Sequence, residues 1–347
     1  MRAIGWLLVL VFGVAAVLTL NPDWLGVLRD DWSDLTTTFP ISQAIALRPL
    51  LFGVFAVLAV VVLVTGVFRL VRMHRGARTL TLGLVLALVA LGHGWTVWDR
   101  GLDGSTGLSA DDGLRSGEPG TGALTVLTYN TQGGATSPED LADIVVENGV
   151  DVVALPEISE ADAQELAGLL AHEGAAFQFF VDATGESDIG STALLVEYSL
   201  GEYLQVDGPD TQLGSVRVEP ADGAGPVLVA VHPVSPRERL TEQWRKDLDA
   251  VMSLCTARRI PGLVLAGDFN ATRDHAPLQD LGSCADAAEL AGAGGVSTWP
   301  VTAPTWLGSA IDHVLIDDAA FEATEAAVVE TGRSDHRGVL VRLQPVD

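Results

Sequence analysis

The sequence predicts an α/β sandwich preceded by three transmembrane helices. Up to residue 98 the chain contains three long apolar stretches, whereas after residue 122 short apolar runs alternate with amphipathic segments. The first pattern is typical of membrane-spanning helices, and the second of strands with helices packed on the outside of their sheets. A chain of 347 residues is long enough for about two domains.

The three apolar stretches cover about residues 3–20, 49–70 and 79–98. Each is long enough to cross a bilayer as a helix. The first stretch also fits a signal peptide with Arg2 as its short positive end, but two further spans follow it and no clear small-residue cleavage site is present. We therefore expect three transmembrane helices.

The charges beside these stretches predict their orientation. Arg69, Arg72, Arg75 and Arg78 surround the short connection between the second and third spans, and basic connections stay in the cytoplasm. The N-terminus is then cytoplasmic, and the chain after Asp99 is extracytoplasmic. The sequence thus predicts a multi-pass protein of the cell membrane with an outward-facing domain.

The region that follows the spans differs from them in composition. Residues 99–122 are rich in Gly, Ser and acidic residues without periodicity, which predicts a flexible linker before a domain over residues 123–347. From Thr121 onward there are 11 Lys and Arg against 36 Asp and Glu. Such a surface disfavours tight binding of duplex nucleic acid, which depends on neutralising phosphates. The lipid bilayer is expected as a partner through the N-terminal helices.

Apolar runs and capping residues predict the elements of the outer domain. The best-marked helix begins after Ser137, which suits an N-cap, has Pro138 at its first position and ends at Gly149. Further helices are expected over residues 161–172 and 237–258. Strands are expected over residues 124–129, 150–155, 176–181, 191–196, 216–218, 227–231, 263–266, 311–316, 326–329 and 339–343.

The chain contains two cysteines, Cys255 and Cys284, both in the outer domain. An even number in an oxidising compartment permits one disulfide bond, and two separate buried thiols are the alternative. Neither cysteine has the setting of a catalytic nucleophile, which needs a nearby His or a helix start.

Chemistry is first suggested by the end of one strand. The apolar run from Leu263 to Ala266 stops at Gly267, and Asp268 and Asn270 follow two residues apart. Residues at this spacing on an extended segment point the same way. A carboxylate and an amide side by side suit activation of a water molecule and binding of a phosphate oxygen, although Gly, Asp and Asn are also ordinary turn residues.

Other strands of the outer domain carry polar residues at comparable places. Asn130 and Glu157 each follow a predicted strand, and His232 follows the run Val229–Val231. Asp312 opens a strand, and the sequence Ser334-Asp335-His336 precedes the last one. Each residue alone has a structural explanation as a turn, cap or core residue, but together they indicate one site.

In this order, the motifs resemble the endonuclease/exonuclease/phosphatase family, which is deoxyribonuclease I-like, in a membrane-anchored bacterial form. The resemblance covers about residues 124–345 and depends most on Gly267-Asp268-Phe269-Asn270 together with Ser334-Asp335-His336. It implies a four-layered α/β sandwich with the site at one edge of two packed sheets. One departure is Pro156, where the family usually has Gln before the metal-binding Glu. That departure weakens any inference about the substrate.

The resemblance also implies roles for the residues. Glu157 would bind Mg²⁺, or Mn²⁺ in its place, with Asn130 and Asp335 assisting at the metal. Asp268 would deprotonate the attacking water. His336 would stabilise charge on the phosphoryl oxygens.

The remaining roles complete the proposed site. Asp312 would accept a hydrogen bond from His336 and fix its tautomer. Asn270 and His232 would bind the phosphate, and His232 would alternatively protonate the leaving oxygen. Arg337 is a candidate for substrate binding, with a solvent-facing position as the alternative. Residues left out of the site are His313, expected on the opposite side of its strand, and Trp299 and Trp306, for which packing is expected and lining of a substrate cleft is the alternative.

The sequence therefore predicts a membrane-anchored, extracytoplasmic, metal-dependent phosphohydrolase. It would cleave phosphodiester or phosphomonoester bonds by in-line attack of water. One alternative is an extracellular nuclease that acts on DNA or RNA. An alternative of another class is a catalytically silent domain for surface binding or signalling. The natural substrate is left open among lipids, nucleic acids and small phosphoesters.

Overall fold

The computed structural model describes residues 2–109, 123–185 and 187–346. The chain forms two compact units, one of Met1–Asp99 with Asp274–Ala276, and one of Arg100–Arg273 with Pro277–Asp347. Part of the predicted linker, residues 110–122, lies outside the described residues.

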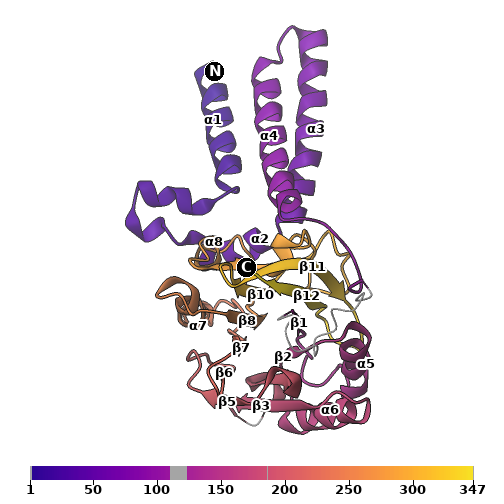
Figure 1. Ribbon diagram of the computed structural model, residues 1–347. Coiled ribbons are helices and arrows are strands. Elements are labelled where there is room, and N and C mark those ends of the chain that lie inside the picture. The colour runs from indigo at the N-terminus through magenta and orange to yellow at the C-terminus, as the bar shows by residue number, and fades with distance from the viewer. Residues whose placement is uncertain (1, 110–122, 186, 347) are drawn as a thin grey trace. The chain divides into compact units, whose positions relative to one another are not determined.

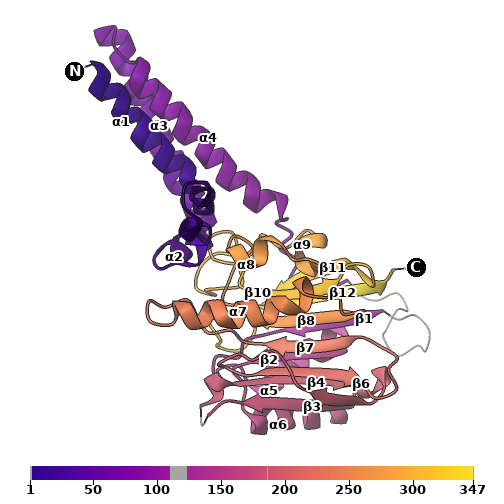
Figure 2. The ribbon, with the colours of Figure 1, turned by 90° about the vertical axis from the view of Figure 1, so that its left-hand side faces the viewer.

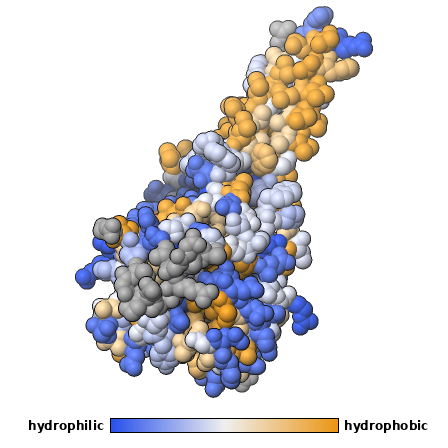
Figure 3. All heavy atoms as spheres, turned by 45° about the vertical axis from the view of Figure 1, so that its right-hand side comes forward, coloured by the Kyte–Doolittle hydropathy of each residue, from blue (hydrophilic) through white to orange (hydrophobic). Residues whose placement is uncertain are grey.

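The first unit is built from apolar helices. They are α1 (Arg2–Leu18), α2 (Ile41–Ala46), α3 (Arg48–Met73) and α4 (Ala77–Asp99), with short 3₁₀ turns at Pro22–Val27, Asp30–Trp32 and Leu35–Thr37. Hydrophobic side chains gather on the long helices, whereas the visible surface of the second unit is largely hydrophilic (Figure 3).

Two of these helices, rather than the three expected, are long and apolar enough to cross a membrane within the described part of the chain. They are α3 and α4. Helix α1 has 17 residues, and at a rise of about 1.5 Å per residue it is shorter than the roughly 30 Å hydrocarbon core. It ends early because the chain turns at Asn21, whose side chain accepts a hydrogen bond from the Asp23 amide and caps the following 3₁₀ turn.

Within the second unit, the residues that follow α4 lie against the domain. The Gly101 carbonyl accepts a hydrogen bond from the Gly295 amide at 2.8 Å, and the Ser105 carbonyl accepts one from Val328 at 2.9 Å. The Leu108 amide donates to the side chain of Asn148. The described first part of the predicted linker is thus attached to the domain by hydrogen bonds.

The second unit has two six-stranded sheets. The first sheet has the order β11-β12-β1-β2-β4-β3 and the second β5-β6-β7-β8-β10-β9. The strands are β1 (Leu124–Thr128), β2 (Val152–Pro156), β3 (Phe177–Ala183), β4 (Ser191–Glu197), β5 (Tyr203–Val206), β6 (Ser215–Pro220), β7 (Val227–Val231), β8 (Leu263–Asp268), β9 (Cys284–Asp286), β10 (Asp312–Asp317), β11 (Phe321–Val329) and β12 (Gly338–Pro345).

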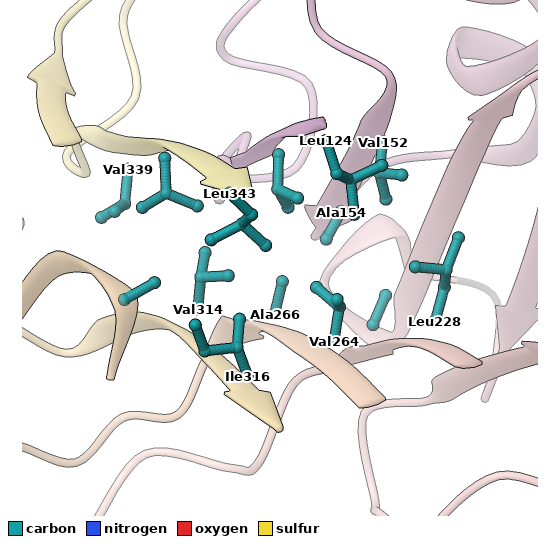
Figure 4. Packing of buried hydrophobic residues seen from close by; sticks show 14 of the residues in the cluster. Leu124, Val152, Ala154, Leu228, Val264, Ala266, Val314, Ile316, Val339 and Leu343 are labelled. Carbon is teal, nitrogen blue, oxygen red and sulfur yellow. The ribbon is translucent and has the colours of Figure 1, made fainter. Parts of the chain in front are cut away.

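The two sheets pack face to face around an apolar core. Val264, Ala266 and Val314 of one sheet point toward Leu124 and Val152 of the other (Figure 4). These side chains alternate along their strands with residues that face the outer helices, as expected for a strand with period two. Burial of both faces explains why the strands read as nearly continuous apolar runs.

Helices cover the outer faces and complete the four layers (Figures 1 and 2). On the first sheet lie α5 (Pro138–Asn148) and α6 (Glu160–His172), and on the second lies α7 (Thr241–Thr256). The short helices α8 (Ala276–Gln279) and α9 (Ala287–Leu290) flank β9, and 3₁₀ turns occur at Asp188–Gly190 and Tyr198–Leu200. The predicted four-layered α/β sandwich is confirmed.

The local prediction at α5 is also confirmed, and the structure decides the state of the two cysteines, which the sequence left open. Ser137 and Asp140 form a reciprocal capping box at the start of α5, and Gly149 ends the helix in the left-handed conformation. Cys255 of α7 and Cys284 of β9 form a disulfide bond with a Cα–Cα distance of 5.4 Å.

Candidate active site

The site forms where strand ends of both sheets meet. Asn130 and Glu157 follow β1 and β2, which are parallel neighbours in the first sheet. Asp268 ends β8 and pairs directly with Asp312, the first residue of β10, in the second sheet. Because parallel strands end at the same edge and antiparallel neighbours begin there, residues far apart in sequence come together.

Asn130 joins the two sheets. Its buried side-chain amide donates to Glu157 Oε1 at 3.1 Å and to Asp268 Oδ2 at 3.0 Å. Its Oδ1 accepts a hydrogen bond from the Gln132 amide at 2.9 Å. The amide therefore orients two carboxylates from different sheets, and its predicted role as a metal ligand stays a prediction.

Glu157 is held in an uncommon backbone conformation, with φ of +62°. Its amide donates to the Ser191 carbonyl, and its carbonyl accepts from Thr131 Oγ1 at 2.6 Å. Burial raises the pKa of the carboxyl, and this effect outweighs the hydrogen bond from Asn130, which lowers the pKa. Left-handed backbone at a non-glycine residue persists only where the surroundings fix it, and such residues gather at functional sites.

Asp268 and Asn270 lie side by side, as the spacing predicts. The Asn270 amide donates to Asp268 Oδ1 at 2.7 Å, and its side chain donates to the Pro233 carbonyl at 3.0 Å. Asn270 also has a positive φ, of +50°. Burial, followed by the charge of Asp312, raises the pKa of Asp268 to about 7.

His336 lies between two carboxylates. Its Nδ1 is 2.9 Å from Asp312 Oδ2, and its Nε2 is 3.7 Å from Asp268 Oδ2. Burial alone would lower the pKa of His336, but the charges of Asp312 and Asp268 outweigh it and raise the pKa to about 10. The imidazole is therefore charged at neutral pH, and the predicted contact with Asp312 is present.

His232 lies close to both Asp268 and Glu157. Its Nε2 is 3.6 Å from Glu157 Oε1 and 3.7 Å from Asp268 Oδ2. Burial, followed by the charge of His336, lowers the pKa of His232 to about 3. This imidazole is therefore neutral at pH 7, which suits a hydrogen-bond donor and disfavours the alternative role as an acid for the leaving oxygen.

Asp335 is at the rim of the site. Its Oδ2 accepts a hydrogen bond from Trp299 Nε1 at 3.0 Å, and its amide donates to Gln132 Oε1 at 3.0 Å. Trp299 keeps 37% of its surface exposed. The structure thus places its indole in contact with a predicted site residue, beyond the packing that was the default expectation.

The predicted role of Arg337 in substrate binding is wrong. The residue is 5% exposed. Its guanidinium contacts Glu330 at 3.2 Å and donates to the carbonyl oxygens of Val301 and Ala303 at 2.7 Å each. These contacts fix the loop that carries Trp299, so the guanidinium of Arg337 stabilises the fold and does not face the substrate.

The sequence analysis assigned no role to three hydroxyl residues that hold the site in place. Ser334 Oγ donates to the Asn130 carbonyl at 2.7 Å and accepts from the His336 amide at 3.1 Å. Thr298 Oγ1 accepts from the Asp312 amide, and Thr131 supports Glu157. Ser334 lies within the motif that carried the resemblance, whereas no sequence pattern marks the two threonines.

The donor set suits a hard divalent cation. Ligand atoms of Asp268, Asp312 and His336 lie within 4.8 Å of one another, and Glu157 shares the Asn130 amide with Asp268. Because His336 is positively charged, the oxygen donors of the site are the carboxylates of Glu157, Asp268 and Asp312. The raised pKa of Asp268 reflects burial and like charge, which a cation would offset. Mg²⁺ prefers such oxygen ligands, so the residues fit the metal that the resemblance implies.

This fold and site define a phosphoester hydrolase. The Endonuclease/Exonuclease/phosphatase family matches residues 127–336, more than half of the chain, and the chain belongs to this family. Members of this family hydrolyse phosphoester bonds and generally use divalent metal ions.

The chain is similar to several solved structures. Humanized D. rerio TDP2 has a TM-score of 0.52 at 19% identity, covering 64% of this chain and 99% of that chain. The human Nocturnin catalytic domain with bound sulfate has a TM-score of 0.48 at 16% identity, covering 65% of this chain and 95% of that chain. The mannosyl-6-phosphatase Bt3783 of Bacteroides thetaiotaomicron VPI-5482 has a TM-score of 0.47 at 16% identity, covering 65% of this chain and 100% of that chain. No curated protein matches the sequence.

Proposed function

We propose that the chain is a membrane-anchored, extracytoplasmic phosphohydrolase that depends on Mg²⁺ or Mn²⁺. The observation that carries the proposal is the convergence of Asp268, His336, His232 and Glu157 within a few Å at one edge of the sandwich. The reaction is hydrolysis of a phosphodiester or phosphomonoester by in-line attack of water.

Asp268 acts as the general base in this mechanism. Burial and the charge of Asp312 raise its pKa, which makes the carboxylate a stronger base toward the proton of the attacking water. The Asn130 and Asn270 amides hold this carboxylate in place. Asn270 also contributes to binding the phosphate.

The two imidazoles stabilise the phosphoryl group in different ways. His336 is positively charged and held by Asp312, so it offsets negative charge that develops on the phosphoryl oxygens. His232 is neutral and donates a hydrogen bond to the phosphate. Glu157, with Asn130 and Asp335 assisting, would hold a divalent cation, which would supply Lewis-acid polarisation of a phosphoryl oxygen.

Three features support the location. Helices α3 and α4 are long and apolar enough to span a bilayer. Arg69, Arg72, Arg75 and Arg78 surround the turn between them, which supports a cytoplasmic position of that turn by the positive-inside rule. The disulfide of the second unit is consistent with an oxidising compartment.

The test uses the full chain in detergent with Mg²⁺ or Mn²⁺. Duplex DNA, single-stranded RNA, phospholipid vesicles and small phosphomonoesters are offered side by side. Asp268→Asn removes the proposed base, and Asp143→Asn removes an exposed carboxylate of α5 as a matched control. The expected result is turnover of one substrate class that survives in Asp143→Asn and is lost in Asp268→Asn.

The outcomes separate the alternatives. Cleavage of DNA or RNA alone would identify a nuclease despite the acidic surface. Equal turnover by Asp268→Asn and the unchanged chain would refute the assignment of the base. No turnover of any substrate, together with no binding of Mn²⁺, would favour a catalytically silent domain.

A further inference from the structure

A second buried carboxylate–imidazole pair lies behind the site, on the opposite face of β10. His313 pairs with Gly267 of β8 and is 3% exposed. Its Nδ1 is 2.7 Å from Asp286 Oδ2, and its Nε2 is 2.9 Å from the Ala271 carbonyl. The expectation that His313 points away from the catalytic residues is confirmed.

Both ring nitrogens of His313 carry a proton. A carbonyl oxygen only accepts, so Nε2 must donate to Ala271, and Nδ1 faces a carboxylate, which also accepts. Burial alone would lower the pKa of His313, but its hydrogen bond and ion pair with Asp286 outweigh it and raise the pKa. The ring is therefore positively charged and donates two hydrogen bonds, one arm from Nδ1 to Asp286 and the other arm from Nε2 to Ala271.

Asp286 fixes one arm of this arrangement. Its Oδ1 accepts the amides of Ala288 at 3.0 Å and Glu289 at 3.2 Å, where it caps α9. Its other oxygen binds His313, so the imidazole is anchored to the start of a helix. The ring also packs edge-on against Phe269, with centroids 5.4 Å apart.

The other arm of His313 reaches the loop that follows the proposed base, Asp268, at the end of β8. Ala271 follows Asn270, which has a left-handed backbone and whose amide donates to Asp268 Oδ1. The same loop is held on the near side by the Phe269 amide, which donates to the Ile311 carbonyl at 2.9 Å. The loop is thus fixed before and after Asn270.

We infer that His313 is a positioning residue for Asp268 and Asn270, acting through the Ala271 carbonyl while Asp286 holds its ring. The inference rests on the proposed function for its effect on turnover. Without the bond to Ala271, a buried carbonyl loses its donor, and the peptide between Ala271 and Thr272 is free to reorient, which loosens the loop that holds Asn270. The Asn270 amide would then leave Asp268.

Two substitutions separate the two arms. A Gln side chain places its amide nitrogen near the position of Nε2, so His313→Gln keeps the donor to Ala271 and loses the contact with Asp286. An Asn side chain places its amide nitrogen near Nδ1, so His313→Asn keeps Asp286 and loses Ala271. The experiment measures kcat, KM and thermal unfolding of the full chain in detergent for both variants.

The expected result is a decrease in kcat of about 10- to 100-fold for His313→Asn, with KM within about threefold, and kcat within about threefold for His313→Gln. A purely structural role would lower the unfolding temperature of either variant and leave the kcat of the folded enzyme unchanged. Wild-type kcat in folded His313→Asn would overturn the inference.

A second readout does not need turnover. The chain contains four Asn residues, at 21, 130, 148 and 270, so ¹⁵N-Asn labelling gives few backbone amide signals, and Asn270→Ser assigns one of them. The Asn270 signal should move in His313→Asn and stay in His313→Gln. If His313→Asn does not fold, a displaced Asn270 signal in His313→Gln overturns the inference, and an unmoved one supports it. An inactive unchanged chain would refute the proposed function, while these signals still decide the role of His313.

Discussion

The disulfide between Cys255 and Cys284 should contribute much of the stability of the second unit. The bond joins α7 to the edge strand β9 across a sequence separation of 29 residues. Loop-closure entropy for a loop of this length gives about 3.6 kcal/mol at 25 °C. A domain is typically stable by about 5–15 kcal/mol, so reduction should remove a large part of that margin.

The assay is urea unfolding of residues 100–347, which contain three hydrophobic clusters of their own. The oxidised protein, the reduced protein and the variant Cys255→Ala/Cys284→Ala are compared by tryptophan fluorescence. At an m value of about 3 kcal/mol/M, reduction should lower the urea midpoint by about 1 M.

The comparison of three samples separates the cross-link from packing. Reduced protein keeps both buried sulfur atoms, so its difference from the oxidised protein reports the cross-link. Its difference from the double Ala variant reports the loss of sulfur contacts in the cluster around α7. Oxidised and reduced proteins with the same midpoint would refute the loop-entropy argument for this bond.

Three further predictions concern the site and its scaffold. Asp312→Asn should lower kcat by about ten- to 150-fold, because a charged hydrogen bond of about 1.5–3 kcal/mol orients His336. Steady-state kinetics test this prediction, and an unchanged kcat would show that the bond from Asp312 to His336 does not contribute to turnover. Glu157→Gln should weaken Mn²⁺ binding at least about tenfold by calorimetry, and equal affinity would place the cation elsewhere. Gly267→Ala should destabilise the domain, because the added Cβ would lie 2.0 Å from the Val231 carbonyl oxygen; a melting temperature equal to that of the unchanged chain would contradict this.

Much of the fold follows from local patterns in the sequence. The strand over Val227–Val231 has the predicted bounds, because its apolar run is short and bounded by polar residues and turn signals. Strands β5 and β9 were missed, because Tyr203–Val206 and Cys284–Asp286 are too short to show a period. Helix α1 was predicted too long, because hydropathy does not mark where the backbone turns.

The sequence by itself determined the apolar helices, the alternation of strands and helices, and the identity of the residues that converge on the site. Only the tertiary structure decided their pairing: Asn130 bridges Glu157 and Asp268 from two different sheets. It also decided that Arg337 faces loop carbonyls and that His313 reaches Ala271. The physical reason is that residue type and spacing fix which side of a strand a group occupies, whereas its partners depend on how the sheets pack.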